Sequence, residues 1–121
     1  MATVLIVEDN PDNMKLIRTV LSGRGHRVIE LTGGERLVAG VRENRPELVL
    51  LDIQLPGEDG YQLLARLQKE FAELPPIVAL TAHAMAGDRE RALRSGFDGY
   101  LTKPIDVATF GRTIEAFLND R

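Results

Sequence analysis

The chain has 121 residues, of which 44% are hydrophobic and 27% charged, and this balance is typical of one folded globular domain over residues 1–121. A net charge of −3 and the absence of tryptophan argue against direct nucleic-acid binding. No apolar run approaches the roughly 18 residues of a membrane-spanning helix, and the lack of cysteine excludes disulfides and fits a cytoplasmic protein.

Five short β-rich segments alternate with segments of helical periodicity. Several of the five are nearly continuous Val/Ile/Leu runs, which is typical of strands buried on both faces of a parallel sheet. The alternation therefore predicts an α/β protein with a doubly wound, five-stranded parallel sheet. The expected strands are Thr3–Glu8, Arg27–Leu31, Leu48–Asp52, Ile77–Leu80 and Gly99–Leu101.

The segments between the strands carry the start and stop signals of helices. Asn10 can cap a first helix, which ends at Gly23. Thr32 and Glu35 form a capping box ahead of a second helix, and this helix stops before Pro46.

Three more helices are expected, from about Gly60 to Glu70, from about Ala84 to Ser95, and from Asp106 onward. The fourth helix alternates arginines with acidic residues, which is typical of a solvated face. We expect it to pack least firmly, because it has few apolar side chains to bury. Those side chains are Met85, Ala92 and Leu93.

Polar residues suited to phosphate chemistry follow four of the five strands. Glu8 and Asp9 follow the first, Asp52 ends the third, and Thr81 and Lys103 follow the fourth and fifth. Ligands bind beyond the carboxyl ends of parallel strands, where the strand order reverses. The second strand is followed by Thr32-Gly33-Gly34, without a carboxylate or lysine, so we place it at an edge. The order 2-1-3-4-5, which is the flavodoxin-like order, brings the other four strands together through right-handed crossovers.

Three carboxylates, a hydroxyl and an ammonium group in one crevice indicate a divalent cation and a phosphoryl group. Mg²⁺ prefers about six oxygen ligands, of which Glu8, Asp9 and Asp52 can supply a part. Lys103 can offset the repulsion between the carboxylates and then pair with a phosphoryl oxygen. Asp52, which ends the most central apolar strand, is the candidate nucleophile toward phosphorus.

Four motifs, in order and at family spacing, resemble those of response-regulator receiver domains. They are Val4–Asn10 (VLIVEDN), Leu51–Gly57 (LDIQLPG), Ala79–Ala82 (ALTA) and Gly99–Pro104 (GYLTKP). The resemblance covers essentially the whole chain. The first two motifs are similar to those of stand-alone cell-cycle receivers of the DivK kind, whereas the segment from the third motif to Met85 is similar to receivers attached to hybrid kinases. Both subfamilies stay open.

The resemblance implies phosphorylation at Asp52. It implies metal binding by Glu8, Asp9, Asp52 and the backbone carbonyl of Gln54, with Mg²⁺ or alternatively Mn²⁺ as the ion. Gln54 and His83 occupy the positions at which the family tunes the lifetime of the phosphorylated state.

The resemblance further implies that Thr81 and Lys103 contact the phosphoryl group, and that the Lys103-Pro104 peptide is cis. After phosphorylation Thr81 is expected to move toward the phosphoryl group, while Tyr100, the aromatic switch residue, turns inward. The altered face would consist of the fourth helix, the fifth strand and the fifth helix.

The implied function is that of a two-component or phosphorelay signalling switch. A histidine kinase or histidine phosphotransfer protein donates the phosphoryl group, and a downstream protein partner reads the change. The domain would catalyse only its own phosphorylation and dephosphorylation, and would be a monomer or a weak phosphorylation-dependent dimer without membrane contact. Two alternatives stay open: a small metal-dependent phosphohydrolase, which usually has a second aspartate where this chain has Gln54, and a phosphorylation-independent scaffold.

Overall fold

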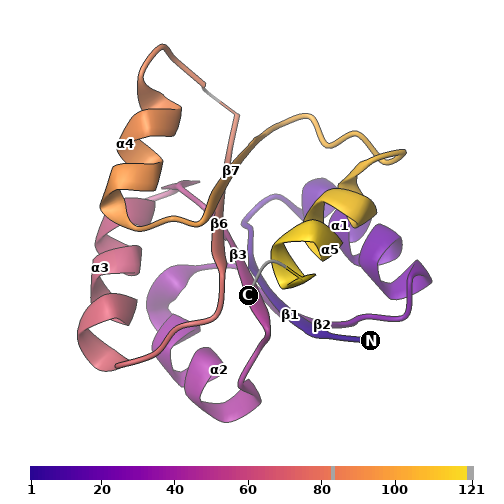
Figure 1. Ribbon diagram of the computed structural model, residues 1–121, viewed down its shortest axis with the longest axis horizontal. Coiled ribbons are helices and arrows are strands. Elements are labelled where there is room, and N and C mark those ends of the chain that lie inside the picture. Colours follow the sequence, from indigo (N-terminus) through magenta and orange to yellow (C-terminus); the bar gives the residue numbers. More distant parts are fainter. Residues whose placement is uncertain (83, 120–121) are drawn as a thin grey trace.

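A computed structural model describes residues 1–82 and 84–119. Its elements are β1 (Thr3–Val7), α1 (Pro11–Gly23), β2 (Arg27–Leu31), α2 (Leu37–Asn44), β3 (Leu48–Asp52), β4 (Gln54–Leu55), β5 (Glu58–Asp59), α3 (Gly60–Glu70), β6 (Ile77–Thr81), α4 (Asp88–Ser95), β7 (Gly99–Thr102) and α5 (Phe110–Asn119). Helices cover both faces of a central sheet (Figure 1). None of the helices in the described residues has the length and apolar character needed to cross a bilayer.

The central sheet has the strand order β2-β1-β3-β6-β7, and all its neighbouring strands are parallel. This confirms the predicted order, because β6 and β7 are the fourth and fifth strands of this sheet. The predicted strand ends agree with the structure to within one residue. The short antiparallel ribbon of β4 and β5 was not predicted.

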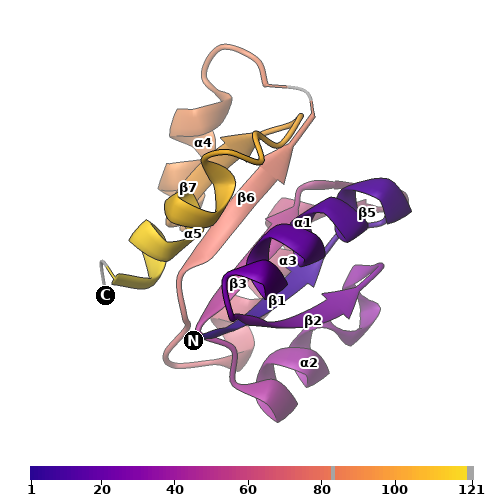
Figure 2. The same ribbon diagram turned by 90° about the vertical axis from the view of Figure 1, so that its right-hand side faces the viewer.

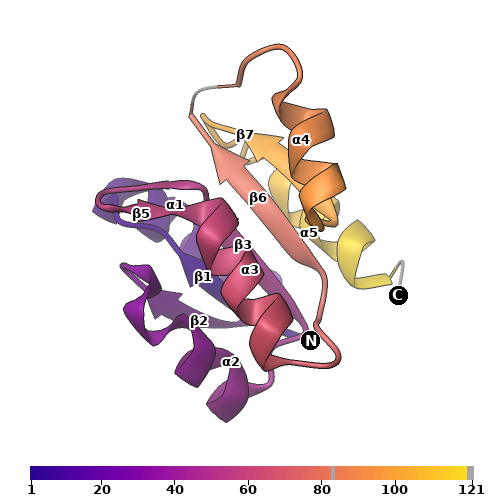
Figure 3. The same cartoon turned by 90° about the vertical axis from the view of Figure 1, so that its left-hand side faces the viewer.

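Two apolar layers fill the space between the sheet and its helices. Helices α1 and α5 cover one face (Figure 2), and α2, α3 and α4 cover the other (Figure 3). Successive strand residues point to opposite faces, so Leu50 packs toward α1 and α5 while Leu51 packs toward the other three helices. The near-continuous apolar runs of the strands are therefore required by burial on both sides.

The predicted capping box at the start of the second helix was wrong. A short 3-10 turn at Gly34–Arg36 precedes α2, and its first residue follows an extended Gly33. The Gly34 N–H donates to the carboxylate of Glu58 at 2.8 Å. A residue that is distant in sequence thus satisfies a backbone donor at the start of this turn.

Helix α4 begins at Asp88, four residues later than predicted. Gly87 has a φ of +87°, which interrupts a right-handed helix, and the Asp88 carboxylate accepts the Met85 N–H at 2.8 Å. The expected burial of Met85 and Leu93 was also wrong, because they are 74% and 42% exposed. The weak packing predicted for this helix is confirmed, since among its residues Ala92 is the buried one.

Helix α5 begins at Phe110 rather than at Asp106. The Asp106 carboxylate accepts the Ala108 N–H at 3.0 Å, and the Asp106 carbonyl accepts the Thr109 and Phe110 N–H groups at 3.1 and 2.9 Å. Asp106 therefore opens a turn that leads into the helix.

A charged cluster ties the end of α1 to α5. Arg24 donates two hydrogen bonds to the Glu115 carboxylate, at 2.8 and 2.6 Å. The Nδ1 atom of His26 accepts the Ala2 N–H at 3.1 Å, so His26 presents its other ring nitrogen, as the donor, to Glu115 at 2.8 Å. The cluster joins residues that lie about ninety positions apart in the sequence.

The stabilisation by Glu115 should disappear in acid. Arg24, and then His26, lower the pKa of Glu115 from the ordinary 4.5 to about 2. Because the folded-state pKa is the lower one, this stabilisation is present above pH 4.5 and is lost as the pH falls toward 2. Urea unfolding should show that Glu115→Gln is less stable than the parent near neutral pH. The difference in the free energy of unfolding should disappear as the pH falls from 4.5 toward 2. A gap that stays constant would contradict the prediction.

Candidate functional site

Five predicted site residues converge at the carboxyl edge of the sheet. Asp52 and Thr81 are the last residues of β3 and β6, Glu8 and Asp9 directly follow β1, and Lys103 directly follows β7. Strands β1, β3, β6 and β7 are consecutive neighbours, with β1 and β3 side by side. The reversal of strand order between β1 and β3 therefore lies where the sequence predicted the crevice.

Two of the three carboxylates are buried and accept hydrogen bonds from nearby backbone. Glu8 is 0% and Asp52 2% exposed, whereas Asp9 is open to solvent. A Glu8 oxygen accepts the Asn10 N–H at 3.1 Å, and Asp52 Oδ1 accepts the Gln54 N–H at 2.8 Å. The backbone after each strand thus fixes the orientation of its carboxylate.

Lys103 is the cation that faces these carboxylates. Its Nζ lies 2.7 Å from Glu8 Oε1 and 2.9 Å from Asp52 Oδ2, and its side chain is 13% exposed. Its backbone N–H donates to the Thr81 carbonyl at 2.8 Å, which aligns the end of β7 with that of β6. The Lys103-Pro104 peptide is cis, as the resemblance implied.

The pKa shifts follow from burial and pairing. Burial raises the pKa of Glu8, against the opposing effects of Lys103 and Asn10, and the Asp52 charge raises it further. Burial alone would lower the pKa of Lys103, but its contacts with Asp52 and Glu8 outweigh burial and raise it. Lys103 is therefore positively charged at neutral pH.

The donor set fits a hard divalent cation. Glu8, Asp9 and Asp52 each offer an oxygen, and these atoms lie within 4.8 Å of one another. The contact of Glu8 Oε1 with Lys103 has the distance of an ion pair but not the angles of a hydrogen bond, so this buried oxygen has no hydrogen-bond partner among the described residues. Carboxylate oxygens are ligands that Mg²⁺ and Mn²⁺ favour.

Millimolar Mg²⁺ should raise the thermal midpoint of the protein. The three carboxylates converge only in the folded chain, so a cation that they hold stabilises the folded state, by about 2.7 kcal/mol at 100 times the dissociation constant. Thermal melts with Mg²⁺ and with EDTA measure the effect. A double variant, Asp9→Ala with Asp52→Ala, should lose the shift. An equal shift in that variant would place the stabilising cation elsewhere.

Two further predicted residues are Gln54, two residues after the strand end at Asp52, and Tyr100 in β7. The Gln54 side-chain carbonyl accepts the Ala82 N–H at 3.0 Å, so this side chain bridges the segments that follow β3 and β6. Tyr100 is 8% exposed, and its hydroxyl has no hydrogen-bond partner among the described residues. His83, the other residue predicted to tune the phosphorylated state, lies outside the described residues.

A contact that the sequence did not predict lies next to the site. The Arg91 guanidinium of α4 stacks on the Tyr61 ring of α3, with the guanidinium carbon 4.0 Å from the ring centroid. The alternating charges of α4 favoured a solvated face, and the sequence carries no periodic signal for pairing across two helices. The one signal in the sequence was that α4 lacks an apolar stripe, which indicates that polar side chains help to hold the helix in place.

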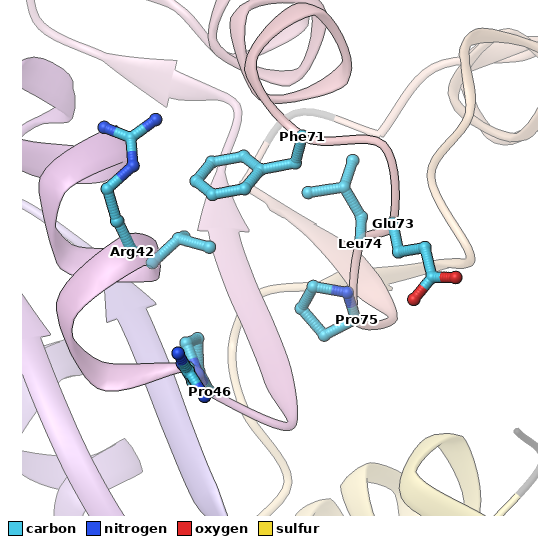
Figure 4. Close-up of a pocket in the computed structure, with 8 residues that line it drawn as sticks. Arg42, Pro46, Phe71, Glu73, Leu74 and Pro75 are labelled. Carbon is cyan, nitrogen blue, oxygen red and sulfur yellow. The ribbon is translucent and has the colours of Figure 1, made fainter.

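A groove at the other end of the sheet has a different character. It has a volume of about 470 Å³ and lies where the chain enters β3 and β6 (Figure 4). The Arg42 guanidinium lies 5.3 Å from the centroid of the Phe71 ring, and Leu74 and Pro75 add apolar surface. The lining contains one carboxylate, Glu73, so the groove does not reproduce the carboxylate cluster at the carboxyl edge.

Comparison with known sequences agrees with this geometry. A family model described as the response regulator receiver domain matches residues 4–115. The polar-differentiation response regulator DivK of Brucella anthropi is 42% identical to this chain over 120 residues, which span 98% of this chain and 97% of the relative. The DivK protein of Brucella melitensis matches with the same identity and coverage.

Solved structures give the same result. The receiver domain of the sensor histidine kinase PA1611 from Pseudomonas aeruginosa, with a magnesium ion coordinated in its active-site cleft, is 35% identical and matches with a TM-score of 0.85 over 97% of both chains. The BeF3-activated N-terminal receiver domain of RstA from Klebsiella pneumoniae is 30% identical and matches with a TM-score of 0.87 over 97% of this chain and 98% of that one. With its sheet order, its acidic crevice and these relatives, the chain belongs to the response regulator receiver domains of two-component signalling.

Proposed function

We propose that this receiver domain is a switch that accepts a phosphoryl group on Asp52 from a histidine kinase or histidine phosphotransfer protein. The observation that carries the proposal is the position of Asp52. Its carboxylate is 2% exposed, contacts Lys103 at 2.9 Å, and shares a cluster of oxygens with Glu8 and Asp9. A candidate nucleophile, a cation and a set of candidate metal ligands thus meet at one edge of the sheet.

Phosphoryl transfer needs chiefly positioning and charge compensation. An oxygen of the Asp52 carboxylate forms a bond to phosphorus, while the bond from phosphorus to the donor breaks and its electron pair leaves with the donor. The carboxylate is already the attacking form, so no general base is needed. The Gln54 N–H fixes the orientation of the Asp52 carboxylate, because it donates a hydrogen bond to Asp52 Oδ1 at 2.8 Å.

Glu8, Asp9, Asp52 and the backbone carbonyl of Gln54 would hold Mg²⁺ or Mn²⁺, and the ion would supply positive charge to the phosphoryl oxygens. Lys103 adds the second positive charge, since its ammonium group contacts two carboxylates and can exchange one of them for a phosphoryl oxygen. These charges compensate the negative charge of the incoming group.

The signal leaves through the surface formed by α4, β7 and α5. Thr81 ends β6, and moving it toward the phosphoryl group displaces the segment that leads into α4. Tyr100 lies in β7, where the strand register pairs it with Ala79 of β6. Because α4 buries little, its displacement changes the surface that a downstream protein meets. The side chain of Gln54, together with His83, sets the lifetime of the phosphorylated state.

The direct test is incubation with acetyl phosphate and Mg²⁺ followed by intact-protein mass spectrometry. We expect a gain of one phosphoryl group that hydroxylamine removes, and no gain with EDTA. Failure to gain this mass would overturn the proposal. Multiple turnover of a generic phosphate ester would favour the phosphohydrolase, although Gln54 stands where such enzymes usually carry a second aspartate. Partner affinities that Asp52→Asn leaves unchanged would favour a phosphorylation-independent scaffold.

We further propose that the domain comprises residues 1–121, works in the cytoplasm, and is a monomer or a weak dimer that phosphorylation favours. The extent of the domain rests on the family match over residues 4–115, and the location rests on the absence of cysteine. Size-exclusion chromatography with light scattering, with and without beryllofluoride, tests the oligomeric state. A stable dimer that forms equally with and without beryllofluoride would contradict the proposed oligomeric state.

A further inference from the structure

The Arg91 and Tyr61 stack is anchored in the core. Besides Arg91 at 4.0 Å, the Tyr61 ring meets Phe97 edge to face, with the ring centroids 5.7 Å apart and the planes at 82°. Phe97 is 3% exposed and belongs to the buried layer beneath α3 and α4. A charged side chain of α4 therefore docks on a rigid aromatic pair.

Helix α4 also packs against β7, but it buries little of its own surface. Among its described residues Ala92 is buried, and the Gln68 side chain of α3 donates to the Ser95 carbonyl at 3.1 Å. Figure 3 shows α3 and α4 as neighbours on the same face of the sheet. The Gln68 contact holds the end of α4, so the Arg91 stack is the cross-helix contact nearer its start.

The stack and the candidate site share a cavity. A space of about 200 Å³ is lined by Arg91 and Tyr61 together with Gln54 and Thr81 of the candidate site. Residues 82–87 connect Thr81 to the start of α4 along the chain. Holding α4 against α3 therefore restrains the position of Thr81.

We propose that Arg91 and Tyr61 are positioning residues that hold α4, and with it Thr81, in the arrangement seen in this structure. This inference rests on the proposed function, in which Thr81 moves toward a phosphoryl group on Asp52. The stack opposes that movement, so breaking it eases the binding of a phosphoryl-like anion at Asp52.

The test is the affinity for beryllofluoride in the presence of Mg²⁺. A cation–π contact at a partly exposed site is weak, so Arg91→Ala should bind the anion about two- to fivefold more tightly. Tyr61→Leu should show the same gain, and combining the two changes should add nothing further. Tyr61→Phe keeps the ring and should behave as the parent, and Arg91→Lys should restore part of the parent affinity.

Arg89→Ala is the matched control, because Arg89 is an exposed arginine of the same helix. Loss of positive charge alone weakens anion binding, so a tighter Arg91→Ala variant beside an Arg89→Ala variant that is not tighter supports the proposal. Unchanged or weaker binding in Arg91→Ala, or an equal gain in Arg89→Ala, would overturn it.

Hydrogen exchange separates this inference from the proposed function. Backbone amides of residues 88–95 should exchange faster in Arg91→Ala than in the parent or in Arg89→Ala, without any phosphoryl analogue. If these amides exchange equally fast in Arg91→Ala and in the parent, that result alone overturns the proposed restraint of α4. If the parent does not bind beryllofluoride, or if Asp52→Asn binds it equally well, the proposed function fails whatever the exchange shows.

Discussion

Replacement of Asp52 by asparagine should abolish phosphoryl acceptance and leave the fold intact. An amide has nearly the shape of a carboxylate and still accepts the Gln54 N–H, but it does not attack phosphorus at neutral pH. Lys103 keeps its contact with Glu8 at 2.7 Å, so the crevice retains a charge pair. Intact mass after incubation with acetyl phosphate and Mg²⁺ should show no adduct, and circular dichroism should match the parent.

The control for Asp52→Asn is Asp12→Asn, which removes an exposed carboxylate from the first turn of α1. This variant should be phosphorylated to the same extent as the parent. An adduct on Asp52→Asn at the level of the parent would show that another residue accepts the group.

Replacement of Lys103 by methionine should destabilise the protein by about 3–5 kcal/mol when divalent cations are absent. Methionine keeps an apolar stem, but Glu8 and Asp52 are then buried without a compensating cation at 0% and 2% exposure. Urea unfolding in EDTA near neutral pH measures the loss. Added Mg²⁺ should recover part of it, because the ion neutralises the same carboxylates.

Two further variants make the Lys103 result specific. Lys15→Met removes an exposed lysine of α1 and should change the free energy of unfolding by no more than about 0.5 kcal/mol. In an Asp52→Asn background the loss caused by Lys103→Met should shrink, since one of the two unpaired carboxylates is gone. A loss as small as that of Lys15→Met would show that Lys103 does not compensate buried charge.

The sheet and the site could be predicted because local sequence signals and simple geometry agree there. Apolar runs buried on both faces identify strands, and the lack of a carboxylate or lysine directly after β2 places that strand at an edge. The same rule brings Glu8, Asp9, Asp52, Thr81 and Lys103 together without any knowledge of side-chain packing. The order of the parallel strands was therefore enough to assemble the site.

The errors lie where distant contacts decide local structure. The start of α2 depends on Glu58, which lies 24 residues from the glycine N–H that it accepts. The start of α4 depends on the left-handed conformation of Gly87, and the exposure of Met85 follows from it. Arg91 meets Tyr61 only because α3 and α4 pack on the same face, and no periodicity in either segment reveals that pair.

The measurement that tests the central claim most directly is borohydride trapping after incubation with acetyl phosphate. Borohydride reduces an aspartyl phosphate to homoserine, and peptide mass spectrometry locates the change. We predict homoserine at position 52 when Mg²⁺ is present, and an unmodified Asp52 when EDTA replaces it. Modification that leaves Asp52 intact while another carboxylate such as Glu8 or Asp9 is reduced, or no reduction at all, would contradict the assignment of Asp52 as the phosphoryl acceptor.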